Sequence, residues 1–123
     1  MKLSTADTIF SKWIRQRDKY ICQRCGKQYH KGDSGLHCSH YFGRIRYTTR
    51  FDPLNCISLC FYCHKYFDET NKKAYYNFKV KQLGLKKLNA LERLANKTIK
   101  DLGWLDKESL EKSIRQLYKP DLE

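Results

Sequence analysis

The sequence predicts an α+β fold, in which a small zinc-braced unit of two strands and a helix is flanked by further helices. Two Cys-x2-Cys pairs enclose the middle of the chain. Between them, one short segment alternates polar and apolar residues as strands do. Toward both ends of the chain, apolar residues recur at the three- and four-residue spacing of helices.

Length and charge limit the possible functions. The chain has 123 residues, so we predict a single domain over residues 1–123, with a core small enough to benefit from a bound metal. Its 25 Lys and Arg against 13 Asp and Glu give a formal net charge of +12. Such a charge favours a polyanionic partner such as nucleic acid. A merely soluble basic surface has the same composition, so charge alone does not identify the partner.

The six cysteines could form disulfides in a secreted protein or bind a metal as thiolates in the cytoplasm. A disulfide scaffold would require secretion, but the N-terminal residues lack the pattern of a signal peptide. No apolar run approaches membrane-spanning length, and no basic amphipathic helix has an interfacial face. We therefore expect a cytoplasmic protein with zinc-bound thiolates and no membrane partner.

The first predicted element is a helix over about residues 5–18. Ser4 is a suitable N-cap, with Asp7 three residues later. Its apolar stripe follows helical spacing and is expected to pack on the zinc unit; it consists of Ile9, Phe10, Trp13 and Ile14.

The two Cys-x2-Cys pairs predict a structural zinc site. Each pair places two thiolates on one side of a tight turn, and two such knuckles complete a tetrahedral site. The ligands would be Cys22, Cys25, Cys60 and Cys63. Cys38 and Cys56 are left over. We expect both to be buried as small apolar residues on paired strands, the alternative being exchange of one of them with a knuckle cysteine.

A strand is predicted over residues 36–41, between the two knuckles. Because side chains alternate between the faces of a strand, His37 and Ser39 share one face and Cys38 and His40 share the other.

A loop over residues 42–52 follows, then a returning strand over 55–59 and a helix from residue 61 to about 70. The loop interleaves aromatic residues with three arginines, which are Arg44, Arg46 and Arg50.

The remaining chain is basic and helical, and we predict a helical region over about residues 72–119. Asn71 and Asp106 are suitable N-caps, and Gly84 suits the end of a helix. The leucine stripes of this region are expected to form core or, alternatively, a dimer seam.

Inside the zinc brace, a second pattern consists of His40, Asn55 and His64. Fourteen and eight residues separate them, and His64 directly follows the last knuckle cysteine. Together with the paired knuckles, this pattern resembles the HNH nucleases, whose ββα-metal (His-Me finger) core would lie at about residues 20–71.

The chain is most similar to the bacteriophage NinG (Rap) recombination nucleases within that family. The likeness covers roughly residues 10–96. It rests on the closing Cys-x2-Cys and on three segments, which are 10–18 (FSKWIRQRD), 40–44 (HYFxR) and 49–56 (TRFDxxNC).

The resemblance implies a metal-dependent DNA endonuclease that hydrolyses phosphodiesters in branched recombination intermediates such as Holliday junctions. A protein of phage origin would act in the bacterial cytoplasm. His40 matches the general base, Asn55 matches the residue that fixes the loop, and His64 matches a ligand of the catalytic ion, Mg²⁺ or Mn²⁺. The loop arginines Arg44, Arg46 and Arg50 would hold backbone phosphates. Because symmetric cutting of a junction needs two active sites, we also predict a homodimer.

One position departs from the common HNH pattern. Many members have Asp directly before the base histidine, as a second metal ligand, whereas this chain has Ser39. His37, on the same strand face, is the alternative ligand. Imidazole ligands accept transition ions as readily as Mg²⁺, so the sequence leaves the catalytic ion open.

A non-catalytic zinc module that binds nucleic acid is the competing interpretation. The knuckles and the basic charge suit it equally well. It gives His40, Asn55 and His64 no reason to keep their spacing, so we favour the nuclease.

Overall fold

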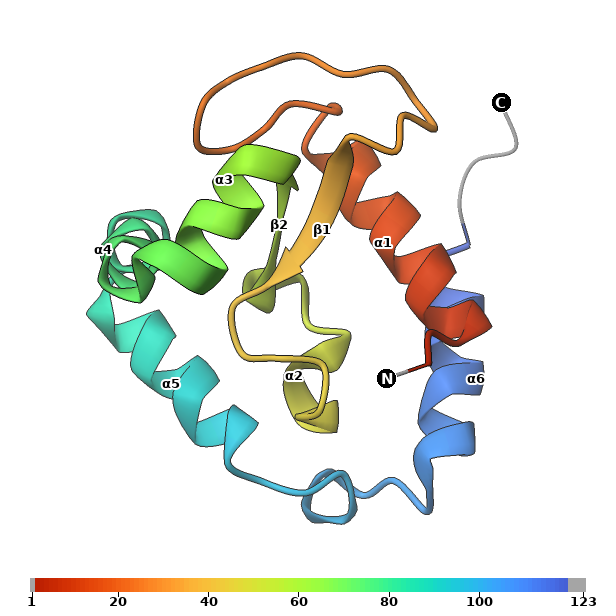
Figure 1. Cartoon of the computed structure of the whole chain (residues 1–123). Helices are drawn as coiled ribbons and strands as arrows, with labels where there is room; N and C mark the ends of the chain where they lie inside the picture. The colour runs from red at the N-terminus through yellow and green to blue at the C-terminus, as the bar shows by residue number, and fades with distance from the viewer. Residues whose placement is uncertain (1, 120–123) are drawn as a thin grey trace.

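Helices surround a single two-stranded sheet in the computed structural model, which describes residues 2–119 (Figure 1). Six α-helices, two strands and three shorter helical turns follow one another in this part of the chain. The α-helices are α1 (Thr5–Arg17), α2 (Tyr47–Arg50), α3 (Phe61–Lys65), α4 (Lys72–Leu83), α5 (Leu85–Ala95) and α6 (Lys107–Leu117). The strands are β1 (Leu36–His40) and β2 (Cys56–Cys60), and the turns are Pro53–Asn55, Tyr66–Thr70 and Lys100–Leu102.

The sheet consists of β1 and β2, which pair antiparallel with His40 opposite Cys56 and Cys38 opposite Ser58. The predicted alternation is confirmed. Cys38 belongs to the core on the α1 side, whereas His37 contacts a side chain of α3 and Ser39 contacts one of α4. The sheet thus presents different chemistry to the helices on its two faces.

Helix α1 covers one face of the sheet, and α6 packs against α1 from the C-terminal end of the chain (Figure 1). The predicted cap is confirmed, because the Ser4 hydroxyl accepts a hydrogen bond from the Asp7 N–H and the Asp7 carboxylate accepts from the Ser4 N–H. The core on this side is formed by Ala6, Phe10, Ile14, Cys38, Phe51, Cys56, Leu110 and Ile114. Burial of Cys38 and Cys56 on the paired strands is thereby confirmed.

The other face of the sheet is covered by α3, the π-helical turn Tyr66–Thr70 and α4. Ile57 and Leu59 of β2 pack there with Phe67 and Tyr75, whose rings stack at 4.5 Å between centroids. Asn71 caps α4 as predicted, accepting a hydrogen bond from the Ala74 N–H at 2.9 Å. Three of the four knuckle cysteines, Cys22, Cys60 and Cys63, belong to the same core cluster on this face.

The segment predicted to be a loop over residues 42–52 contains the short helix α2, which packs against α5. Thr48 Oγ1 donates to the Leu94 carbonyl at 2.7 Å, and Arg46 Nη1 donates to Asn96 Oδ1 at 2.7 Å. These bonds satisfy acceptors at the C-terminal end of α5. Contacts with a distant helix therefore stabilise a turn that local sequence did not indicate.

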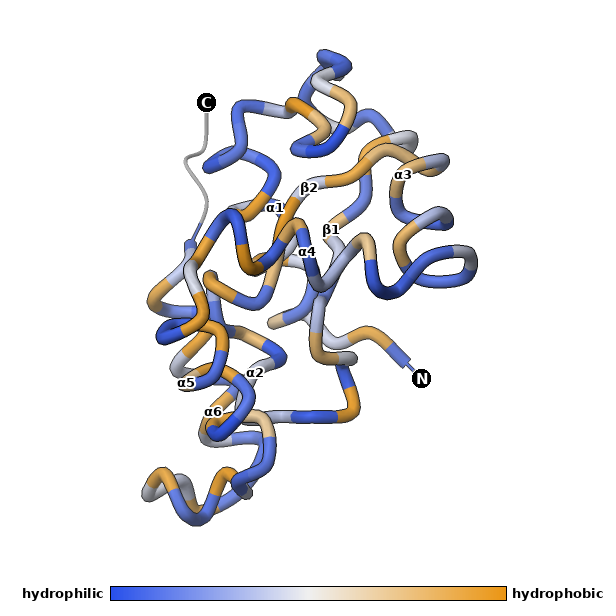
Figure 2. The backbone as a smooth tube through the Cα atoms, turned by 90° about the vertical axis from the view of Figure 1, so that its left-hand side faces the viewer, coloured by the Kyte–Doolittle hydropathy of each residue, from blue (hydrophilic) through white to orange (hydrophobic). Residues whose placement is uncertain are grey.

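No helix within residues 2–119 combines the length and apolarity that membrane crossing requires. Figure 2 shows the same feature, since hydrophobic and hydrophilic residues alternate along the helices.

Candidate active site and metal centre

The four knuckle cysteines meet at the end of the sheet where β1 begins and β2 ends. Their Sγ atoms all lie within 4.8 Å of one another, and those of Cys25 and Cys60 are 3.9 Å apart. A tetrahedral zinc with Zn–S bonds of about 2.3 Å separates its sulfurs by about 3.8 Å. The cluster therefore fits a structural zinc ion, as the paired motif predicts.

Hydrogen-bond donors around this cluster favour thiolates. The Cys25 N–H donates to Cys22 Sγ at 3.5 Å, and the Cys63 N–H donates to Cys60 Sγ at 3.4 Å. Arg24 Nη1 donates to Cys63 Sγ at 3.4 Å. Burial raises the pKa of the Cys22 thiol, but N–H groups of Cys25, Cys60 and Arg24 outweigh burial and lower it to about 7. At Cys63, by contrast, burial and the neighbouring Cys60 and Cys22 thiols outweigh the bond from Arg24 and raise the pKa to about 12, so the donors favour the thiolate form most clearly at Cys22.

His40 ends β1, with its Nε2 atom 2.9 Å from the Arg50 carbonyl oxygen. Because a carbonyl only accepts, Nε2 carries the proton of the neutral ring and Nδ1 keeps a free lone pair. Nδ1 is buried and has no hydrogen-bond partner among the described residues. Burial, assisted by the charge of Arg44, lowers the pKa of His40 to about 4. At neutral pH the ring is therefore uncharged and able to accept a proton.

Asn55 is fully buried and holds the loop that reaches His40. Its Oδ1 atom accepts from the Phe42 N–H at 2.8 Å. Its Nδ2 atom donates to the carbonyls of Phe42 at 2.9 Å and Thr49 at 3.0 Å. The amide thus ties together the two ends of the segment that presents the Arg50 carbonyl to the imidazole.

His64 lies in α3 between two polar partners. Its Nδ1 atom is 3.0 Å from Nδ1 of His37, and its Nε2 atom is 2.9 Å from Oδ2 of Asp68, one helical turn later. Two ligands at right angles, each about 2.1 Å from an octahedral ion, lie about 3.0 Å apart. His64 and Asp68 are in direct contact, and the same separation would suit two neighbouring ligands of a divalent ion. His37 touches the opposite ring nitrogen, where it can orient the His64 ring.

Ser39 has a different neighbour. Its hydroxyl is fully buried and lies 2.7 Å from the Tyr75 hydroxyl of α4. The expectation that Ser39 takes part in the catalytic metal site is therefore wrong, because its oxygen is committed to the core. The carboxylate that lies beside His64 is that of Asp68.

Three cavities form a linked row beside β1. One of about 420 Å³ is lined by residues that include Arg15, Arg44, His37 and His64. His37 and His64 also line a second, of about 340 Å³, together with Asp68. Asp68 in turn lines a third, of about 400 Å³, together with His40 and Lys72.

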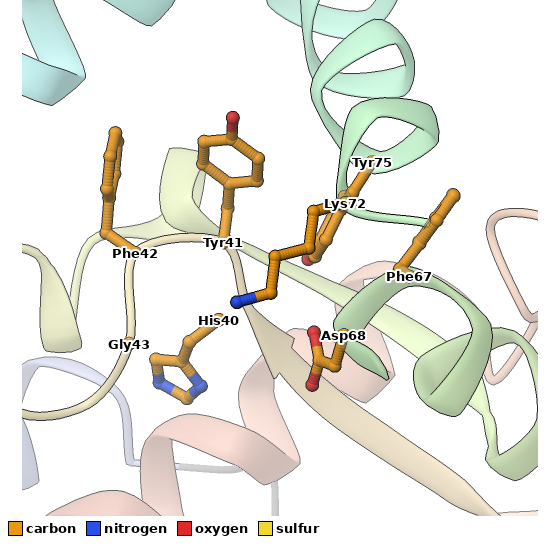
Figure 3. A pocket seen from close by; sticks show the side chains of 8 residues that line it. All are labelled: His40, Tyr41, Phe42, Gly43, Phe67, Asp68, Lys72 and Tyr75. Atoms are coloured by element: carbon orange, nitrogen blue, oxygen red, sulfur yellow. The ribbon is translucent and has the colours of Figure 1, made fainter. Parts of the chain in front are cut away.

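Figure 3 shows the third cavity, with the Lys72 side chain extending toward His40 and Asp68. The three cavities together are lined by three histidines, three carboxylates and four basic side chains; the carboxylates are Asp33, Asp68 and Glu69, and the basic residues are Arg15, Arg44, Lys65 and Lys72.

The loop arginines have three different environments. Arg50 is only 3% exposed, and its guanidinium pairs with the Asp7 carboxylate, to which Nε donates at 2.8 Å. The expectation that it holds DNA phosphates is therefore wrong. Arg46 is exposed but donates to Asn96. Arg44 lines the 420 Å³ cavity, and its buried Nε has no hydrogen-bond partner among the described residues, so it is the best placed of the three to meet an anion.

The sequence analysis did not identify Asp68 as a candidate ligand. It also did not identify Arg15 as a candidate phosphate-binding residue. Asp68 stands four residues after His64, a spacing that places both side chains on one face of a helix. Arg15 has no comparable signal, because the packing of α1 on the sheet brings it to the cavity that His37 and His64 line. Neither protein families, nor curated proteins, nor solved structures gave a match to this chain.

Proposed function

We propose that this chain is a metal-dependent DNA endonuclease of the HNH type, with a structural zinc and one catalytic divalent ion. The observation that carries the proposal is the pairing of two features along one row of cavities. His40 has a fixed tautomer and a free Nδ1 lone pair. His64 and Asp68 have the separation of neighbouring metal ligands. Phosphodiester hydrolysis requires both a base and a cation.

In the proposed reaction, the attacking water enters through the cavity that His40 lines and gives its proton to the buried Nδ1 atom of the ring. The Nε2–H bond to the Arg50 carbonyl keeps the ring oriented and stabilises the imidazolium that forms. The low pKa of His40 rises when an anionic phosphodiester binds nearby, because negative charge favours the protonated ring. His64 Nε2 and Asp68 Oδ2 would hold Mg²⁺ or Mn²⁺, which stabilises charge on the phosphate and on the leaving oxygen.

Arg15 and Arg44 are proposed to bind the phosphate that enters the 420 Å³ cavity. Both arginines line this cavity beside His37 and His64. Arginine binds phosphate oxygens with two parallel donors, so two arginines would also set the direction of the strand. The net charge of +12 supports a DNA substrate, and branched recombination intermediates are the class that the sequence resemblance implies.

The test is cleavage of a labelled four-way junction, a flap and a matched duplex in Mg²⁺, Mn²⁺ or EDTA. We expect divalent-dependent products, and a loss of about two to four orders of magnitude in rate for His40→Ala with little change in junction affinity. Asp68→Asn should raise the divalent concentration needed for half-maximal cleavage. His30→Ala, at an exposed histidine outside the site, is the control and should cleave as wild type does.

Two outcomes would instead favour a non-catalytic zinc module. One is that every substrate, single strands included, remains intact in every ion. The other is that His40→Ala cleaves as fast as wild type.

A further inference from the structure

A second group of metal-binding side chains lies on the α1 side of the sheet. The Sγ atoms of Cys38 and Cys56 and a ring nitrogen of His40 all lie within 4.8 Å of one another. Cys38 is 5% exposed and Cys56 is fully buried. We propose that this trio is a second metal site for a thiophilic ion such as Zn²⁺, and that occupation of this site switches off His40.

The donor set has the chemistry of a zinc site. Two cysteines and one histidine occur at zinc sites that keep a fourth position open. Histidines that bind metals usually donate their other ring N–H to a carbonyl or carboxylate, which fixes the ligating nitrogen. His40 already makes this bond, with the Arg50 carbonyl, and its Nδ1 atom has no other partner among the described residues.

Binding at the trio is balanced in charge and in protons. The two thiols would release two protons to solvent, and the two resulting thiolates would neutralise the two positive charges of the ion. His40 would give only a lone pair, because its single ring proton is on Nε2. The site as a whole would then be uncharged, so neighbouring Arg44 would not be repelled.

An ion has a route to this site. Cys38 lines the 420 Å³ cavity together with Arg44 and His64. The trio is therefore next to the surface that is proposed to receive DNA. None of its three residues is a knuckle cysteine, so the two sites can be filled independently.

Occupation of the trio and base catalysis exclude each other. An ion at Nδ1 uses the lone pair that would otherwise accept the proton of the attacking water. The structure thus points to inhibition of cleavage by excess zinc. The inhibition rests on the proposed function, whereas binding of a second ion does not.

Binding is tested under reducing conditions with protein that already holds one zinc per chain. A second equivalent, supplied as Co²⁺, should give the thiolate-to-cobalt absorption expected of two sulfur ligands. Loss of an outer-shell partner weakens metal binding by about 10- to 100-fold, so loss of a ligand in Cys38→Ala should weaken the second ion by at least about 100-fold. His30→Ala should bind it as wild type does.

The binding proposal is wrong if wild type takes up no second ion with thiolate absorption, or if Cys38→Ala binds the second ion equally well. Circular dichroism checks that Cys38→Ala is folded. If it is not, Cys38→Ser, which nearly conserves volume, replaces it in the same comparison.

Inhibition is tested at saturating Mg²⁺ by adding Zn²⁺ in steps. Wild type should lose cleavage over the range in which the second ion binds, and the inhibition constant should rise at least about 100-fold in Cys38→Ala. Equal inhibition of both proteins would overturn the switch. A wild type that cleaves nothing even without added zinc would overturn the proposed nuclease function, and the cobalt titration would still decide whether the second site exists.

Discussion

Individual side chains at this site are held by partners from distant segments. His40 is oriented by the Arg50 carbonyl, and Arg50 is held in turn by Asp7 of α1. Burial raises the pKa of Asp7, but hydrogen bonds from Arg50 and Ser4 outweigh it and lower that pKa. A chain of contacts thus links the N-terminal helix cap to the proposed general base, so substitution of Asp7 or Arg50 should affect both stability and the orientation of His40.

The buried neutral ring of His40 predicts a pH dependence of stability. Its pKa is about 4 in the folded protein, below the ordinary value of 6.5 that applies to the unfolded chain. Above pH 6.5 both states are uncharged at His40 and the stability is fully present. As pH falls from 6.5 to about 4, the unfolded state takes up the proton first, and stability should fall by up to ~3 kcal/mol.

Urea denaturation of wild type and His40→Gln between pH 7 and pH 4.5 measures this effect. The variant should lose less stability over that range, whereas His30→Gln should follow wild type. Zinc release and titration of His37 affect all three proteins alike and cancel in the comparison. Parallel curves for wild type and His40→Gln would contradict a buried, neutral His40.

Substitution by alanine should affect stability at Arg50 and DNA binding at Arg44. Arg50→Ala leaves the Asp7 carboxylate buried without its partner, which costs about 3–5 kcal/mol of stability. Arg44→Ala should leave stability nearly unchanged but reduce the slope of log affinity for DNA against log salt by about 0.9, the effect of one phosphate contact. Thermal melts and binding at several salt concentrations measure both. A flattened slope with normal stability for Arg50→Ala would reverse the assignment.

Among the elements, the second knuckle connects the metal to the site most directly. Cys60 ends β2, Cys63 lies in the first turn of α3, and His64 follows it. Zinc would therefore fix the start of α3, and with it the direction in which His64 and Asp68 point. The first knuckle contributes the opposite two ligands from the loop after α1.

Removal of the structural zinc should unfold the sheet and α3 together, because a site of four cysteines joins segments that are far apart in the chain. Purified protein should hold about one tightly bound zinc per chain. Cys60→Ser with Cys63→Ser should lose that zinc and the native circular dichroism, whereas Cys38→Ala should keep both. Native circular dichroism in the zinc-free double variant would show that the fold does not depend on the metal.

At the scale of the whole molecule, the C-terminal helices return to the N-terminal helix, because α6 packs on α1. Several leucines of this region nevertheless remain exposed, including Leu105 at 79% and Leu117 at 69%. They lie in the stretch whose leucine content suggested a dimer seam as an alternative to core.

We expect two chains to bind one four-way junction, because one chain carries one proposed active site and a symmetric cut needs two. Sedimentation of protein with labelled junction should give two chains per junction at saturation. Leu117→Glu should weaken that assembly while leaving the circular dichroism unchanged, and Lys119→Gln, which lowers the net charge by the same one unit, is the matched control. One chain per junction at saturation would exclude this arrangement.

Local patterns in the sequence determined much of this protein. The Cys-x2-Cys spacing predicted the thiolate cluster, strand alternation predicted the faces of β1, and Ser4, Asn71 and Asp106 marked where helices begin. These features depend on residues that are close together in the chain, so the local sequence is enough to predict them. The roles proposed for His40, Asn55 and His64 came from their spacing and await the cleavage test.

Only the tertiary structure decided which distant side chains meet. The Ser39 hydroxyl is hydrogen-bonded to Tyr75 of α4, and the Arg50 guanidinium is paired with Asp7 of α1. Two residues that were expected at the site therefore belong to the core. Asp68 joins His64 because the helix continues past the knuckle through a π-helical turn. Each outcome depends on how helices pack around the sheet, and that packing is set by the combined burial of many side chains, which no local spacing records.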